Sequence, residues 1–248
     1  MRADIFLVEK GFAESRSRAK NIIEDGRLSV NGKSISKASC DISDADKVEV
    51  IPAPEYEYVS RGGYKLQAAL DHFGIDVKGL VAVDLGASSG GFCDCLLCRG
   101  IKKIYAVDCG SGQLAVKIRN DARVISIENT NARFIDDSLF GEKADIVVMD
   151  LSFISQTLVF PAVSRILKDG GMLVSLIKPQ FEAGRAAIGK NGIVKNEKDR
   201  KNAIARVTEN AKLFGLTPRE VIASPIKGGD GNVEYLTVFD FCTNEITV

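Results

Sequence analysis

Four charged residues in the chain have the chemistry of a proton-transfer site: Lys65, Asp150, Lys178 and Glu234. A lysine amine can act at an oxygen that loses its proton, and a carboxylate can hold such an amine in place. Taken singly, each residue is explained equally well as a solvated charge at the end of a strand or helix. They form a site only if the fold brings four separate elements to one edge of a sheet.

A glycine-rich turn marks where that edge lies. Residues 81–92, V-A-V-D-L-G-A-S-S-G-G-F, predict a buried strand, a tight turn and the start of a helix. Gly86, Gly90 and Gly91 remove side chains where a ligand approaches the backbone, and the helix offers unpaired N–H groups. A dinucleotide fingerprint requires glycine at position 88, which is Ser88. The later glycine pair is typical of the S-adenosylmethionine (SAM) turn of class I methyltransferases, although small residues here also permit close helix packing alone.

Strands and helices alternate after this turn, which predicts an α/β fold with a parallel sheet covered on both faces. Asp108 ends the second strand, 22 residues after Gly86, where a carboxylate can accept hydrogen bonds from ribose hydroxyls. The third strand exits at Asn131, placed to contact an adenine ring. The fourth and fifth strands end at Asp150 and Lys178. Open sheets bind ligands at this edge.

The last part of the chain predicts a helix over 198–214 and two strands, 219–225 and 233–241. The short loop between the strands favours an antiparallel hairpin that closes the sheet, and Glu234 begins the final strand. Between the fifth strand and the helix, a glycine-rich segment carries Arg185, Lys190 and Lys195. This basic segment is either a surface connection or a loop that closes over RNA.

A small unit precedes the sheet domain. Residues 4–10 and 15–24 have the apolar spacing of helices, with Ser15 as N-cap and Gly26 as the stop. Asn31-Gly32 is a strong hairpin signal, and a strand follows at 47–51. The segment I-P-A-P-E-Y-E-Y predicts an extended linker. We therefore expect domains at 1–51 and 60–248, joined by residues 52–59.

The formal net charge is zero, so any nucleic acid must meet a local basic patch. The small unit has a surplus of basic residues between positions 10 and 37, and Arg16 and Lys20 share one helical face. A basic helical face is more often solvated than functional. Here, however, S-R-S-R-A-K-N-I-I-E-D-G-R-L-S-V-N-G-K resembles the ribosomal protein S4-type RNA-binding domain. The resemblance implies RNA contacts from Lys10, Arg16, Arg18, Lys20, Arg27 and Lys33.

Composition limits the kinds of site and the cellular locations that the sequence allows. The single histidine, His72, lies near a predicted helix end and favours a surface or capping role. Cys93, Cys95 and Cys98 lack further ligands at metal-binding spacing, so we expect buried small side chains and no metal. No signal peptide and no spanning segment are predicted, which indicates a cytoplasmic protein.

The whole chain resembles the TlyA/hemolysin A family, in which an S4-type domain precedes an FtsJ-like RNA 2'-O-methyltransferase domain. The motifs that carry the resemblance are S-R-G-G-Y-K-L, D-L-G-A-S-S-G-G-F, A-V-D-C-G, V-V-M-D-L-S-F-I-S, L-I-K-P-Q-F-E and G-N-V-E-Y. One departure is Ser89, where related members often carry proline. The order lysine, aspartate, lysine, glutamate matches the family's catalytic tetrad.

The resemblance implies SAM as cofactor and ribosomal RNA as partner, with methylation of a ribose 2'-hydroxyl. Lys178 is the candidate base if the positive charges of Lys65 and the sulfonium keep it neutral. A cationic Lys178 would only stabilise the alkoxide. Glu234 would orient Lys65, and Asp150 would hold the Lys178 amine. Expected cofactor contacts are Gly86, Ser88, Gly90, Gly91, Phe92, Asp108, Asn131 and Asp150, and expected RNA contacts of the second domain are Arg61 and Arg185.

Two other functions are weighed beside this one. A pore-forming protein, suggested by the name hemolysin, lacks a spanning or strongly amphipathic helix in the sequence. A nicotinamide-dependent oxidoreductase would also place a carboxylate on ribose, but Ser88 and the four charged residues speak against it. The modified nucleotide, the ribosomal subunit and the oligomeric state do not follow from the sequence, although a monomer is favoured.

Overall fold

The computed structural model describes residues 1–24, 26–51, 58–189, 192–228 and 231–246. The chain separates into two compact units, Met1–Glu57 and Tyr58–Val248. Most of the expected linker, residues 52–57, lies outside the described residues, as do Lys190 in the basic segment and positions 229–230 in the last hairpin loop.

The first unit has the expected two helices and a small sheet. Helix α2 is capped by Ser15, whose Oγ accepts from the amide of Arg18 at 3.3 Å. Asn31 and Gly32, with φ of 52° and 78°, turn the chain between β1 and β2, as a type I' hairpin requires. The elements are α1 (Ala3–Glu9), α2 (Arg16–Glu24), β1 (Leu28–Val30), β2 (Lys33–Ser34) and β3 (Val48–Val50), with strand order β2-β1-β3.

A buried carboxylate fastens the two helices of this unit. Asp4 in α1 is fully buried, and it accepts hydrogen bonds from Arg2 at 3.0 Å and from Arg16 of α2 at 2.9 Å. These two guanidinium groups hold the pKa of Asp4 well below its usual range. Apolar side chains such as Phe6 and Leu28 fill the space beneath. Arg16, expected to face RNA, therefore also has a structural role.

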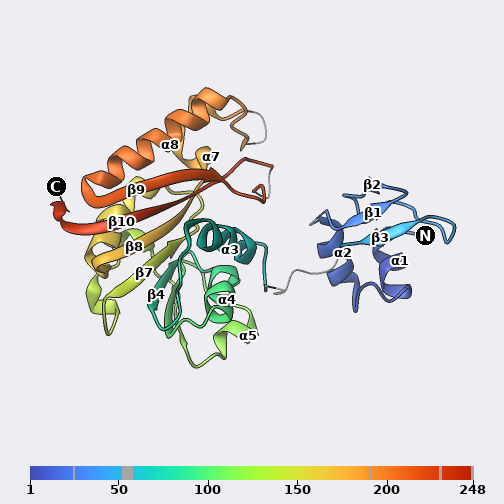
Figure 1. Ribbon diagram of the computed structural model, residues 1–248, viewed down its shortest axis with the longest axis horizontal. Helices are drawn as coiled ribbons and strands as arrows, with labels where there is room; N and C mark the ends of the chain where they lie inside the picture. Colours follow the sequence, from blue (N-terminus) through green and yellow to red (C-terminus); the bar gives the residue numbers. More distant parts are fainter. Residues whose placement is uncertain (25, 52–57, 190–191, 229–230, 247–248) are drawn as a thin grey trace. The chain divides into compact units, whose positions relative to one another are not determined.

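The second unit contains the predicted sheet, closed by an antiparallel hairpin (Figure 1). Its seven strands run in the order β6-β5-β4-β7-β8-β10-β9, with β10 antiparallel to both of its neighbours and the first five strands parallel. The strands are β4 (Val81–Leu85), β5 (Lys103–Val107), β6 (Val124–Ile127), β7 (Ala144–Met149), β8 (Leu167–Ile177), β9 (Phe214–Ala223) and β10 (Tyr235–Ile246).

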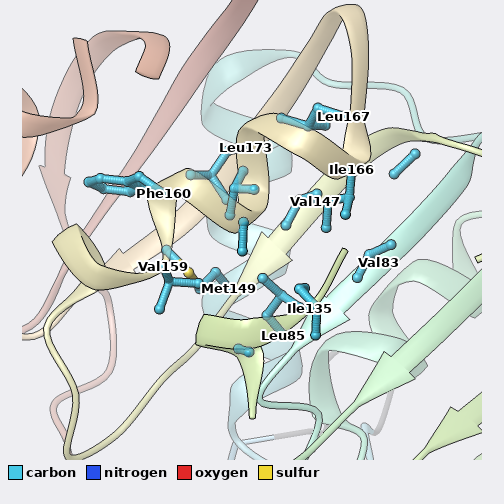
Figure 2. Close-up of a cluster of buried hydrophobic side chains, with 14 of the residues drawn as sticks. Val83, Leu85, Ile135, Val147, Met149, Val159, Phe160, Ile166, Leu167 and Leu173 are labelled. Atoms are coloured by element: carbon cyan, nitrogen blue, oxygen red, sulfur yellow. The ribbon is translucent and has the colours of Figure 1, made fainter. Parts of the chain in front are cut away.

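Helices cover both faces of this sheet. On one face, Val83, Leu85, Val147 and Met149 pack against α6 and α8 in a continuous apolar cluster, part of which is shown in Figure 2. Helices α3 and α4 pack against each other and are grouped together in Figure 1. The helices are α3 (Gly62–Phe73), α4 (Gly91–Cys98), α5 (Val116–Arg119), α6 (Phe160–Ile166), α7 (Pro179–Glu182) and α8 (Glu197–Lys212).

Strand β9 begins earlier than predicted. The sequence placed residues up to 214 in the preceding helix and began the strand at 219, whereas the helix ends at Lys212 and the strand begins at Phe214. Gly215 and Pro218 obscured the signal, because both interrupt a strand pattern. Strand β9 lies at the edge of the sheet, where a proline without an N–H is tolerated.

The chain enters the second unit through two anchored residues. Tyr58, which is buried, packs on Gly63, so closely that a Cβ at position 63 would overlap its ring. The amide of Val59 donates to the buried carboxylate of Asp94 in α4 at 2.9 Å, and Lys117 donates to the same carboxylate. Tyr58 and Val59, expected in the linker, are thus held within the sheet unit.

We expect the Asp4→Asn substitution to loosen the first unit, because a neutral amide cannot pair with Arg2 and Arg16. Since the folded-state pKa of Asp4 is lowered, its stabilising effect is present above the ordinary pKa of about 4 and is lost as pH falls toward the folded-state value. Hydrogen exchange at pH 7 should show faster exchange in α1 and α2 of the variant, with the second unit unchanged. Asp44→Asn, which removes an exposed partner of Lys10, is the control. Equal protection in both variants would contradict the role of Asp4.

Candidate active site

The glycine turn lies at the point where the strand order reverses. From β4 the chain moves to β5 and β6 on one side and then returns to β7 on the other, which opens a crevice at the carboxyl ends of the strands. Gly86 has φ of +86°, and a Cβ there would lie 2.6 Å from the carbonyl oxygen of Asp150. The amide of Asp150 bonds to the carbonyl of Leu85 at 3.1 Å. Only glycine lets the two strand ends come this close.

A cavity of about 610 Å³ opens beside the turn, a size suited to a nucleoside-containing cofactor. Asp108 lies in its wall, and its carboxylate accepts from the amides of Ser88 at 2.8 Å and Gly110 at 2.7 Å. Asn131 lines the same cavity and caps a short 3-10 helix by accepting from the amide of Arg133. Apolar walls come from Leu151, Ile154 and Leu158. The donor set and the missing side chain at position 86 fit an adenosine group.

The structure distributes the expected cofactor residues over two neighbouring cavities. Gly86, Ser88 and Asp150 line both the large cavity and a smaller one of about 240 Å³. Gly91 and Phe92 line the smaller cavity alone. Gly90 lines neither. A Cβ at position 90 would press on Leu114 and Ile118, so this glycine permits close packing of α5.

Lys178 and Asp150 form an ion pair at the mouth of the crevice. The Lys178 Nζ lies 2.6 Å from Asp150 Oδ1, while its hydrogen bond goes to Ser152 Oγ at 2.9 Å. Only 11% of the Lys178 side chain is exposed. The amine is therefore held by two groups on the segment after β7, and Asp150 Oδ1 has no hydrogen-bond donor among the described residues.

Lys65 and Glu234 form a second, more deeply buried pair. The Lys65 Nζ donates to Glu234 Oε2 at 2.6 Å, and the two side chains are 10% and 3% exposed. Lys65 projects from the first turn of α3 into the smaller cavity. A cation at a helix N-terminus is unfavourable for the helix dipole, and the carboxylate offsets this cost.

The ladder between β8 and β10 brings the two pairs together. Tyr235 is paired with Ile177 at its end, so Glu234 and Lys178 leave the ladder at the same level on adjacent strands. Gln180 Nε2 lies 3.5 Å from Glu234 Oε1 and connects α7 to the second pair. Lys65 and Asp150 line the same small cavity. The four charged residues predicted from sequence thus gather at one edge of the sheet.

A buried carboxyl group lies beneath the turn. Asp84 in β4 is fully buried, and its Oδ2 accepts from the thiol of Cys93 at 3.0 Å. Burial raises the pKa of Asp84 to about 7, and the nearby charge of Asp150 acts in the same direction. Cys93 and Cys95 are buried, as expected, while Cys98 is half-buried.

Two features of the site were not predicted. Asn232 is buried and bridges two loops: its Oδ1 accepts from Val194 N at 3.0 Å, and its Nδ2 donates to Gly192 O at 3.1 Å. Phe153 is 91% exposed, lines the large cavity and has φ of +65°, which is strained for an aromatic residue. Both residues lie within motifs that carry the family resemblance, G-N-V-E-Y and V-V-M-D-L-S-F-I-S, but no role was predicted for either of them.

The expected RNA-binding side chains are exposed or half-buried, and several have internal partners. Lys10 pairs with Asp44 at 2.7 Å, and Arg27 donates to the carbonyl of Ile51 at 3.1 Å. Lys20, Lys33, Arg61 and Arg185 are exposed, as is Arg18. The structure does not test their contacts with RNA.

Other sequence expectations concern metal, membrane and His72. His72 lies at the surface beside Glu220, at 3.1 Å. Among the described residues, no group of three or more His, Cys, Asp or Glu side chains is arranged to hold a metal ion. Within the same residues, no helix has the length and apolar character needed to cross a membrane.

Comparison with known families assigns both units. Residues 58–241 match the family described as FtsJ-like methyltransferase, and residues 1–48 match the S4 domain.

Curated relatives are similar over nearly the whole chain. Hemolysin A of Brachyspira hyodysenteriae is 43% identical, with 96% of this chain and 99% of that protein covered. The 16S/23S rRNA (cytidine-2'-O)-methyltransferase TlyA of Mycobacterium tuberculosis is 41% identical over 94% of this chain and 87% of its own length. A Streptococcus thermophilus protein of solved structure, provisionally named a hemolysin, is 39% identical with a TM-score of 0.76, covering 98% of this chain and 88% of that one.

We expect Gly86→Ala to lower the affinity for SAM by about tenfold or more, which requires only about 1.4 kcal/mol. The added methyl group would meet the carbonyl of Asp150 and would stand at a positive φ. Calorimetric titration measures the affinity. Gly79→Ala is the matched control, because Gly79 has a similar φ of +76° but open space around its Cα. If Gly86→Ala binds SAM as tightly as Gly79→Ala does, the close approach of residue 86 to Asp150 does not shape the cofactor site.

We expect Asn232→Ala to release the loop around Val194, because the buried amide of Val194 loses its partner at a cost of about 1–3 kcal/mol and the carbonyl of Gly192 loses its bond to the same side chain. Faster amide exchange at Val194 and faster proteolysis of the loop would report the release. Asn196→Ala is the control, since it removes only the N-cap of α8. If both variants protect Val194 as well as the unaltered protein does, the bridge has no such role.

Proposed function

The chain belongs to the family of FtsJ-like methyltransferases that carry an N-terminal S4 domain, and we propose that it methylates a ribose 2'-hydroxyl in ribosomal RNA with SAM as donor. The observation that carries this proposal is the meeting of two lysine–carboxylate pairs beside a side-chain-free turn and a nucleoside-sized cavity. The TlyA protein of Mycobacterium tuberculosis is, by its name, a methyltransferase of the 2'-oxygen of cytidine in 16S and 23S rRNA.

The residues present fit the cofactor. Asp108 can accept from a ribose hydroxyl through its Oδ2, which is bonded only to the amide of Ser88 and retains a free lone pair, whereas its Oδ1 accepts from the amide of Gly110 and from Gln113 Nε2. Asn131 and the apolar side chains around it would hold the adenine ring. The cofactor supplies an electrophilic methyl group on a positively charged sulfur. Asp150, at the boundary of both cavities, provides the nearest negative charge.

Lys178 would accept the proton of the attacking hydroxyl. A ribose hydroxyl is a weak nucleophile, so it must lose its proton as it attacks. The Lys178 amine, in its uncharged form, would take that proton and become an ammonium group. Asp150 and Ser152 fix the direction of the amine.

Lys65 would stabilise the negative charge that develops on the oxygen. Its ammonium lies in the small cavity and is held by Glu234, which leaves two of its three protons free for a substrate oxygen. The pair is largely removed from water, which strengthens such an interaction.

RNA binding would be shared by the two units. We assign residues 1–51 as the S4 domain that contacts phosphates and RNA shape, and residues 60–248 as the methyltransferase domain. The exposed ring of Phe153 beside the large cavity offers a face on which a splayed-out base can stack. With a ribosomal RNA substrate the protein would act in the cytoplasm, and we propose that it does so as a monomer.

We expect Lys178→Ala and Lys178→Arg to lose about 100-fold or more of methyl transfer to ribosomal RNA, because general-base catalysis contributes on that scale. Arginine keeps the charge but cannot act as a base, so it separates proton transfer from charge stabilisation. Transfer from radiolabelled SAM measures the rate, and calorimetry should show SAM binding nearly unchanged.

Lys168→Ala is the matched control. Lys168 lies at the start of β8, the strand that Lys178 follows, and pairs with Asp145 at 2.6 Å at the opposite end of the sheet. Its loss should leave methyl transfer unchanged. An active Lys178→Arg enzyme would remove Lys178 from the role of base, and binding of NAD in place of SAM would exclude the methyltransferase.

A further inference from the structure

Two cations line the small cavity and have no partner among the residues that the structure describes. Arg61 precedes α3, and Lys227 lies in the segment that joins β9 to β10, yet both line this cavity with Lys65. Both side chains are exposed. In the part of the chain that the structure describes, neither makes a hydrogen bond or ion pair, in contrast to most charged residues around the site.

The charges of the site are otherwise balanced. Lys65 is paired with Glu234 and Lys178 with Asp150, at 2.6 Å in each case. Among the described residues that line the small cavity, Arg61 and Lys227 are therefore the cations left without a carboxylate partner. Such cations at a partly enclosed site attract an anion.

The other walls of the cavity suit a small oxyanion and not a nucleobase. Besides the charged residues and Phe92, they consist of serines, glycines and one alanine: Ser60, Gly62, Gly86, Ala87, Ser88, Ser89 and Gly91. The serine hydroxyls of these walls can donate to a phosphate, whereas the amides of Gly86, Ala87 and Ser88 are already bonded within the protein. The volume of about 240 Å³ is too small for a nucleotide held together with its base, which the large cavity and Phe153 would accept.

We propose that Arg61 and Lys227 together bind the RNA phosphodiester adjacent to the target ribose. This inference rests on the function proposed above and identifies the part of the substrate that sets the position of the ribose. A phosphate held here lies next to Lys65 and Asp150, which line the same cavity. The 2'-hydroxyl is thereby brought to the tetrad without any base being read.

The position of Lys227 links this phosphate site to the catalytic pair. The adjacent Gly228 packs on Glu234 so closely that a Cβ would lie 2.5 Å from Glu234 Oε1, and its amide bonds to Asn232 O at 2.9 Å. The backbone that carries Lys227 is thus fixed against the carboxylate that orients Lys65. Lys227 acts as a positioning residue for the acceptor.

The carboxylate of SAM is also an anion that could bind at this site. The experiment therefore separates binding of the RNA phosphate from binding of that carboxylate. Binding of 16S and 23S rRNA transcripts by the full chain would be measured between 50 and 300 mM salt for Lys227→Ala, Lys227→Arg and Arg61→Ala. We expect Lys227→Ala to weaken RNA binding and to reduce the slope of log Kd against log salt by about one. At saturating RNA its kcat should fall about tenfold, because the ribose is misplaced. Lys227→Arg should restore both values, and SAM affinity should not change.

Lys102→Ala is the control, an exposed lysine at the amino-terminal edge of the sheet that should alter none of these quantities. A loss of SAM affinity in Lys227→Ala would assign the anion site to the cofactor and overturn the proposal. An unchanged salt slope together with an unchanged kcat would also overturn the proposal, because Lys227 would then be only a solvated lysine. If the unsubstituted protein binds rRNA but transfers no methyl group, the proposed function is overturned. If the unsubstituted protein is active and Lys227→Ala behaves in the same way, only the phosphate site is overturned.

Discussion

The site depends on one close approach of two backbones. Gly86 at the end of β4 passes so near the carbonyl of Asp150 at the end of β7 that no side chain fits between them. The parallel pairing of these strands and the amide bond from Asp150 to Leu85 fix that approach. Because the chain reverses its direction of travel across the sheet at this point, the two strand ends form one wall of a crevice. The cavities, and the charged residues that line them, follow from this contact.

Charge compensation explains how two lysines can be placed at one edge of a sheet. Two buried ammonium groups would repel each other and would lose their hydration. A carboxylate buried beside each ammonium group offsets this cost. The partners come from different elements: Glu234 from the start of the last strand serves Lys65 of α3, and Asp150 serves Lys178. Each pair therefore also fixes one element against another. The antiparallel β8–β10 ladder then sets the level of the two pairs.

Much of this could be predicted from the sequence because its signals are local. The strand and glycine pattern of residues 81–92 indicated the turn, and the strand ends at Asp108, Asp150 and Lys178 indicated the edge. The predicted start of β9 was wrong because Gly215 and Pro218 interrupt a strand pattern. Only the position of β9 at the edge of the sheet makes these residues acceptable in a strand.

Pairings between distant residues had no such signal. The Asn232 bridge to Gly192 and Val194 depends on how two loops meet, as does the shared cavity of Arg61 and Lys227. Similarly, Gly90 matched the ligand-turn pattern, but it serves the packing of α5. The roles of the predicted cofactor and RNA contacts remain predictions.

The anchoring of Val59 has a mechanical consequence. Its amide is bonded to Asp94, in the first turn of the helix that begins at Gly91. Tension along the covalent connection from the first unit is therefore delivered to α4 before it reaches the strands. Gly91 and Phe92 of the same helix line the smaller cavity, so the hydrogen bond of Val59 also connects the entry of the chain to a wall of that cavity.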